Sequence, residues 1–122
     1  MLDFKFIFNY KLRKKADFDF VLKERKRIFS DDFIFFYRAN ALGYPRLGVL
    51  INKKNCRLAV TRNCLRRKIR ELFRLQQQTL SGFDLVVMLQ SPTDKTLIRD
   101  RFSCLKKMFS ALEIQCRKSA LL

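Results

Sequence analysis

The sequence predicts a single domain of the α+β class, in which helices pack against one four-stranded sheet to form a two-layer sandwich. The 122 residues are enough for one hydrophobic core and too few for two independent ones. Hydrophobic residues make up 48% of the chain and include 13 Phe, which is enough apolar surface to offset the entropy lost on folding. The apolar pattern changes period along the chain in the order helix, strands, helix, strand, helix.

The first predicted helix is short and amphipathic. Asp17 is expected to cap its N-terminus, and three apolar side chains then share one face at positions i, i+3 and i+4: Phe18, Val21 and Leu22. Residues 1–11 precede it as an expected flexible segment. They do not resemble a signal peptide, because their aromatic stretch comes before the basic cluster instead of after it.

Four segments have strand character. Residues 27–30 are expected to form a short edge strand, and residues 33–38 a strand with apolar side chains on both faces. A turn at residues 43–45 separates this strand from the alternating pattern of residues 46–52. Residues 83–90 are almost wholly apolar and predict a buried strand.

Two longer helices complete the predicted domain. The helical period runs from about residue 58 to residue 78. Ser91 is expected to cap the last helix, with Pro92 in its first turn. That helix carries an apolar stripe at spacings of four and three residues: Ile98, Phe102, Leu105, Phe109 and Leu112. Residues 116–122 are expected to fray.

The charge balance points to a polyanionic partner. The 27 Lys and Arg against 11 Asp and Glu give a formal net charge of +16, for which nucleic acid is the leading partner. A membrane is not expected to be the partner, since there is no interfacial anchor, no lipidation signal and no apolar run near ~20 residues. The four cysteines form no C-x-x-C pair and the chain has no histidine, which favours reduced thiols in a cytoplasmic protein over a metal site.

The predicted helix over residues 58–78 separates its apolar and basic residues onto two arcs. At about 100° per residue, one arc is apolar: Leu65, Ile69, Leu72 and Phe73. The other carries the candidate RNA-binding residues: Arg62 at its border, then Asn63, Arg66, Arg67, Arg70 and Arg74. Guanidinium groups pair bidentately with phosphates, so this face predicts a reader of the nucleic-acid backbone. The alternative is a merely solvated helix face, but Glu71 is the sole acid here. Asn63 has its own alternatives: a local cap or turn, or a hydrogen bond to a base, phosphate or hydrated metal.

The residues in and around this helix resemble the central signature of the protein subunit of bacterial ribonuclease P. The similarity lies in a glycine-containing strand, a paired-lysine turn and an Arg-Asn helix: Leu47-Gly48-Val49, Lys53-Lys54, Ala59, Arg62-Asn63, Arg66-Arg67, Ile69-Arg70-Glu71 and Phe73-Arg74. It extends to Leu12-Arg13-Lys14 with Asp17-Phe18, and to residues 82–87. Cys64 departs from the pattern, because the family usually has a second Arg at this position.

The resemblance implies a ribosomal-protein-like sheet with a left-handed βαβ crossover and a basic helix that docks on the catalytic RNA subunit. Lys53 and Lys54 join the helix residues as implied RNA contacts. The resemblance also implies a cleft that holds the 5′ leader of precursor tRNA. By position it would be lined by Phe18, Leu22 and Phe36, for which packing in the core is the alternative role.

The resemblance therefore implies a subunit of a ribonucleoprotein endoribonuclease, forming a heterodimer with RNA and not a homo-oligomer. No catalytic residue is expected in the chain, since it lacks histidine and its carboxylates are scattered. Mg²⁺ is expected in the RNA–protein holoenzyme, and no cofactor is expected on the protein alone. A ribosomal or other structural RNA-binding protein is the alternative, and a nucleoid-type DNA binder is a third.

Overall fold

The computed structural model describes residues 11–12, 14–23 and 26–121. It confirms the α+β class with the predicted order of elements. These are α1 (Lys15–Lys23), β1 (Arg27–Phe29), β2 (Phe33–Ala39), β3 (Arg46–Leu50), α2 (Ala59–Leu75), β4 (Phe83–Leu89), the 3₁₀ turn η2 (Lys95–Leu97) and α3 (Ile98–Leu121). The expected flexible segment over residues 1–11 falls almost entirely outside the described residues.

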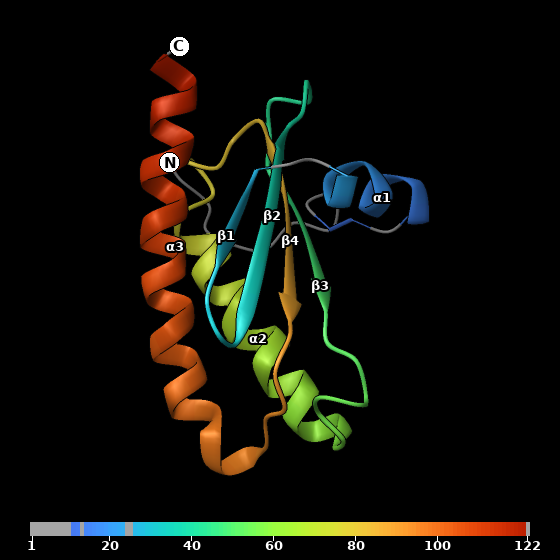
Figure 1. The fold of residues 1–122 in the computed structure, drawn as a ribbon. Coiled ribbons are helices and arrows are strands. Elements are labelled where there is room, and N and C mark those ends of the chain that lie inside the picture. The colour runs from blue at the N-terminus through green and yellow to red at the C-terminus, as the bar shows by residue number, and fades with distance from the viewer. Residues whose placement is uncertain (1–10, 13, 24–25, 122) are drawn as a thin grey trace.

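The four strands form one mixed sheet in the order β1-β2-β4-β3. The pairs β1–β2 and β2–β4 are antiparallel, whereas β3 and β4 are parallel. A parallel pair needs a crossover, which α2 supplies. In Figure 1, β3 lies to the right of β4, both strands run downwards and α2 lies behind them, so the β3–α2–β4 connection has the left-handed sense that is rare in proteins.

The helices cover the two faces of the sheet unequally (Figure 1). α2 and α3 pack on one face, where Phe33, Phe35 and Tyr37 point from β2 as predicted. The Phe35 ring meets the Phe109 ring of α3 edge-on, with centroids 4.9 Å apart. α1 packs on the other face, where Val21 lies over Phe36 of β2 in a smaller cluster.

The predicted division of α2 into two arcs is also confirmed. Leu65, Ile69 and Phe73 are fully buried against the sheet, and Leu72 packs beside them. Because these residues recur every three or four positions, one side of α2 is fixed in the core and the basic side faces outwards.

The helix boundaries differ from the sequence prediction in three places. α1 begins at Lys15, so Asp17 lies inside its first turn and is not the cap. Asp94, not Ser91, caps η2 by accepting a hydrogen bond from the Thr96 amide, because the Ser91 hydroxyl donates to Asp32 instead. α3 continues to Leu121, which places the segment expected to fray within the helix, and Cys116 is the last side chain of α3 that is buried among the described residues.

All four cysteines are free thiols in the structure. Burial raises the pKa of Cys116 to about 11, which keeps this thiol protonated near neutral pH. Among the described helices, none has both the length and the apolar composition that crossing a bilayer requires.

Candidate nucleic-acid interface

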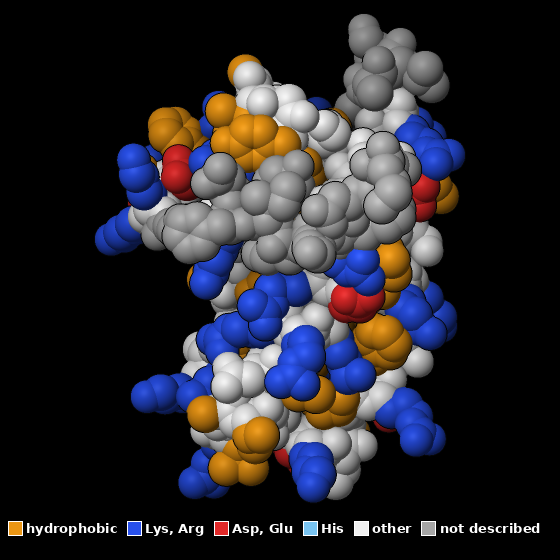
Figure 2. All heavy atoms as spheres, turned by 180° about the vertical axis from the view of Figure 1, so that it is seen from behind, with side chains coloured by type: hydrophobic (Ala, Val, Ile, Leu, Met, Phe, Trp, Pro, Cys, Tyr) orange, Lys and Arg blue, Asp and Glu red, His pale blue; other side chains and the backbone are white. Residues whose placement is uncertain are grey.

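The outward side of α2 forms a basic surface on the helix layer of the molecule. Figure 2, which looks at the sheet from behind, shows Lys and Arg side chains crowded over this layer with few acids between them. Asn63, Arg67 and Arg70 are exposed, and Arg66 is half-buried. Within the described parts of the chain, no carboxylate forms an ion pair with Arg66, Arg67 or Arg70. Their charge is therefore available to an external anion.

Arg62, at the border of the predicted face, uses part of its guanidinium group for hydrogen bonds within the protein. One of its terminal nitrogens donates hydrogen bonds to the carbonyls of Cys56 and Arg57, each at 2.9 Å. These carbonyls lie just before α2, whose N-cap residue Leu58 contributes no side-chain hydrogen bond. Arg62 thus ties the incoming loop to the helix while its remaining N–H groups keep their capacity to donate.

Asn63 makes a local contact with the next turn of the helix. Its side-chain oxygen accepts a hydrogen bond from Arg66 at 3.2 Å on the exposed surface. The contact leaves the Asn63 amide N–H groups without an acceptor among the described residues, so they can donate to an external one.

Arg74 differs from Arg66, Arg67 and Arg70 because it has a carboxylate partner on α2. It forms a two-point ion pair with Glu71, one turn earlier on α2. The hydrogen bonds raise the pKa of Arg74 and lower the pKa of Glu71. The C-terminal end of the basic surface is therefore partly neutralised.

Lys53 and Lys54 lie exposed in the turn that follows β3, ahead of α2. Asn55 fixes this turn on both sides: its amide N–H donates to the Asn52 side chain at 2.8 Å, and its side chain donates to the Leu89 carbonyl at 3.2 Å. The paired lysines thus extend from a turn that is bonded to the sheet.

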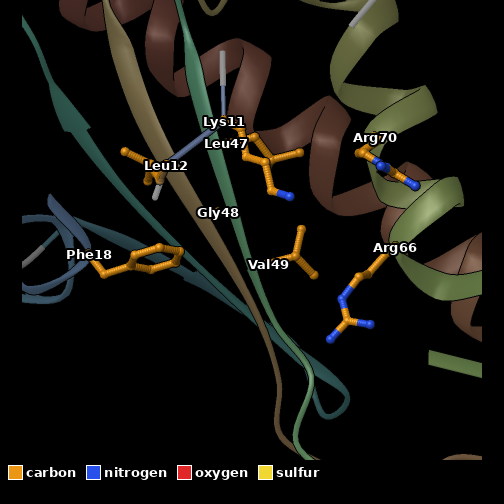
Figure 3. Close-up of a pocket in the computed structure, with 8 residues that line it drawn as sticks. All are labelled: Lys11, Leu12, Phe18, Leu47, Gly48, Val49, Arg66 and Arg70. Carbon is orange, nitrogen blue, oxygen red and sulfur yellow. The ribbon is translucent and has the colours of Figure 1, made fainter. Parts of the chain in front are cut away.

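A small cavity of about 120 Å³ lies where α1, β3 and α2 approach one another. It is lined by Lys11, Leu12, Phe18, Leu47, Gly48, Val49, Arg66 and Arg70. Figure 3 shows the Phe18 ring on one side of β3 and, on the other side, the Arg66 side chain extending from α2 towards the strand with Arg70 beside it on α2. The cavity combines an apolar wall with two guanidinium groups.

Gly48 makes this approach of α1 to the sheet possible. A Cβ atom at this position would lie 2.4 Å from Cε1 of Phe18, far inside van der Waals contact. The absence of a side chain on Gly48 therefore lets the Phe18 ring lie directly on β3. The sequence signal for this contact is the glycine within an otherwise alternating strand.

Phe36 and Leu22, the other two residues predicted for the cleft, do not line this cavity. Phe36 is only 7% exposed and packs with Val21 and Val86, while the Arg27 guanidinium lies 5.4 Å from its ring centroid. Leu22 is half-buried and packs against the same cluster. Of the three, Phe18 is the one that lines the cavity.

The sequence prediction missed an ion-pair cluster that anchors α1. Arg46 donates to both carboxylate oxygens of Asp84, at 2.8 and 2.7 Å, and its remaining nitrogen lies 3.5 Å from Asp17 of α1. Asn40 donates to the same Asp84 at 2.7 Å. The hydrogen bonds that Arg46 donates to Asp84 raise the pKa of Arg46. A carboxylate in the apolar run of residues 83–90 was the available signal, since a buried charge requires a partner.

Comparison with known proteins gives consistent results. The family model described as Ribonuclease P matches residues 6–113. The ribonuclease P protein component of Coxiella burnetii is 33% identical over 115 residues, covering 94% of this chain and 95% of the relative. That of Nitrosococcus oceani is 36% identical over 119 residues, covering 98% and 100%.

Solved structures agree with these sequence matches. The RNase P protein from Thermotoga maritima, in complex with 1-(4-fluorophenyl)-2-thiourea, has a TM-score of 0.66 at 32% identity, covering 83% of this chain and 94% of that one. The Staphylococcus aureus RNase P protein has a TM-score of 0.69 at 25% identity, covering 87% and 94%. None of these similarities favours the ribosomal or nucleoid alternative.

Proposed function

The chain belongs to the ribonuclease P protein family, and we propose that, as the protein subunit of this ribonucleoprotein endoribonuclease, it holds the 5′ leader of precursor tRNA beside the RNA subunit. Membership of the family implies the ribonuclease P RNA as partner. The leader and the surfaces that contact each RNA are the proposed part. The observation that best supports this proposal is the cavity that Phe18, Gly48, Arg66 and Arg70 help to line.

This cavity has the two features that a single-stranded RNA site needs. The Phe18 ring and the neighbouring β3 backbone offer an apolar surface on which a base can stack. Arg66 and Arg70 lie across β3 from that ring and carry the charges that pair with phosphates (Figure 3). A leader that passes over Phe18 would thus meet α2 with its backbone.

The rest of the basic surface is assigned to the RNA subunit. Asn63 and Arg67 face away from the sheet, and Lys53 and Lys54 extend from the preceding turn. A-form RNA helices are recognised mainly through shape, phosphates and 2′-hydroxyl groups, which suits a surface of cations with few base-reading side chains. The same helix therefore connects the two RNAs.

The described acidic residues support the assignment of the chemistry to the RNA subunit, because six of them already have structural partners. Asp84 and Asp17 bind Arg46, Asp32 binds Arg101, Glu71 binds Arg74, Glu113 binds Arg117, and Asp94 caps η2. Among the described residues, no three potential ligands gather around a common point. The proposal places the Mg²⁺ ion with the RNA, whose phosphate oxygens are ligands that this ion prefers.

Cleavage of precursor tRNA by the reconstituted holoenzyme tests this role. The wild-type protein, combined with the ribonuclease P RNA of the same genome, should stimulate cleavage at low Mg²⁺. It should also favour a long leader over a single leader nucleotide in kcat/KM. An unstimulated reaction would contradict the proposed function as a whole.

Two phenylalanines of α1 provide a matched pair for the leader site. Phe18→Ala should reduce the preference for a long leader by roughly fivefold or more, because stacking of one base is worth about 1–3 kcal/mol. Phe20→Ala is the control, since Phe20 is 58% exposed on the same helix and lies outside the cavity. Neither variant should change affinity for the RNA subunit. Equal losses of leader preference in both variants would contradict the placement of the leader at Phe18.

A further inference from the structure

A second group of cations lies between α2 and α3, apart from the predicted RNA-binding residues. The Lys68 ammonium of α2 is 4.6 Å from the centroid of the Phe102 ring of α3, and the Lys106 ammonium is 5.1 Å from the same centroid. The structure thus brings two positive charges from two helices to one aromatic ring. We call this group the Lys68–Phe102–Lys106 cluster.

Internal carboxylates do not balance these charges. Among the described residues, neither Lys68 nor Lys106 forms an ion pair, and the nearby Glu71 is occupied by Arg74. Arg99 adds a further exposed cation on the same side of α3, since it precedes Lys106 by two helical turns. A cation–ring contact at the surface contributes only about 0.5–1 kcal/mol, so the ring alone offsets little of the repulsion within a protein of net charge +16.

The cluster lies on the opposite side of α2 from the cavity. Lys68 is two residues from both Arg66 and Arg70, and two residues turn a side chain roughly 200° around the helix. Arg66 and Arg70 line the cavity beside β3, whereas Lys68 contacts the Phe102 ring of α3. One phosphate therefore cannot contact both groups, and an anion at the cluster would be a separate ligand.

We propose that the Lys68–Phe102–Lys106 cluster is a second phosphate-binding site, which takes the backbone of the ribonuclease P RNA on the α3 side of α2. This rests on the proposed function and extends it. A phosphate between the two ammonium groups relieves their repulsion, and the half-buried Phe102 fixes the two lysine stems at its ring. The RNA subunit then contacts the helix layer at two separated places, with α2 between them.

The salt dependence of binding separates this site from general electrostatic attraction. The test compares the full-length protein with Lys68→Gln/Lys106→Gln and with a control of the same charge, Lys107→Gln/Lys118→Gln. Lys107 and Lys118 are exposed on α3 but lie away from Phe102. The cluster variant should lower the slope of log affinity against log salt by about 0.7–0.9, the value for the one lost phosphate contact.

The control should leave the slope close to that of the wild type, and Lys68→Arg/Lys106→Arg should restore it. Equal slopes for the two glutamine variants would overturn the proposal. Hydroxyl-radical footprinting of the RNA adds a second readout: the cluster variant should lose protection at a segment that Arg66→Gln/Arg70→Gln retains. The proposal would also be overturned if the cluster variant and Arg66→Gln/Arg70→Gln lost protection at the same RNA segment.

These outcomes are distinguishable from failure of the proposed function. If the wild-type protein stimulates cleavage and the cluster variant binds with an unchanged slope, only the second site is wrong. Circular dichroism melting of each variant identifies any loss of folding. The Lys68→Arg/Lys106→Arg variant keeps both positive charges, so it tests whether charge, and not the lysine side chain itself, determines the slope.

Discussion

The two faces of the sheet are held by very different amounts of apolar packing. Among the residues that the structure describes, 19 buried residues form one continuous cluster on the face covered by α2 and α3. On the face covered by α1, the corresponding described cluster has four buried residues, and the ion pairs of Arg46 add to it. The basic helix is thus fixed rigidly, whereas the helix that carries Phe18 is attached by a few contacts. Rigid fixing of α2 suits a surface on which another molecule docks. Light attachment of α1 suits a cleft that must admit a flexible RNA strand.

The largest expected effect is on the heavily packed face. Phe73→Ala removes a fully buried ring from the core side of α2 and should lower the free energy of unfolding by about 3–5 kcal/mol. Urea denaturation measures this loss. The basic surface should lose RNA affinity along with stability, because α2 would no longer be held in place. A cost below about 1 kcal/mol would show that this face is not the structural platform.

The next largest effect on the free energy of unfolding is expected at Arg46, which anchors α1 to the sheet. Arg46→Gln leaves the Asp84 carboxylate, which is 7% exposed, without its main partner. The cost should be about 3 kcal/mol, since a buried charge is left uncompensated. The double variant Arg46→Gln/Asp84→Asn should recover part of it, because the unpaired charge is gone. If the double variant is no more stable than Arg46→Gln, the Arg46–Asp84 ion pair does not determine the stability of the face covered by α1.

The smallest expected effect concerns charge alone. Glu71→Gln frees Arg74 from its internal partner on the exposed side of α2 and should leave the urea unfolding midpoint unchanged. RNA affinity should rise by about two- to threefold, because one more guanidinium can meet a phosphate. The pKa of Glu71 is lowered, so the native pair is present above its ordinary pKa and is lost as the pH falls through the lowered value. The gain in the variant should therefore shrink at acid pH, and salt-dependent binding measurements at two pH values check this.

The sequence predicted the elements, the two arcs of α2 and the alternation in β2, because these follow from periods of apolar residues that are local. The resemblance added the crossover and the leader cleft. The sequence alone did not predict the partners of Arg46 or the contact of Lys68 with Phe102, since these join residues far apart in the chain. It also placed the last cap at Ser91, because the competing acceptor Asp32 comes from a distant turn.

The position of β4 has a consequence for how the protein is made. β2 and β3 follow each other in the chain, yet β4 lies between them in the sheet and is synthesised after α2. A nascent chain that ends before Phe83 therefore has its arginine-rich helix complete while β2 and β3 still lack their shared neighbour. The cations of α2 are therefore synthesised before the sheet that positions them can be completed.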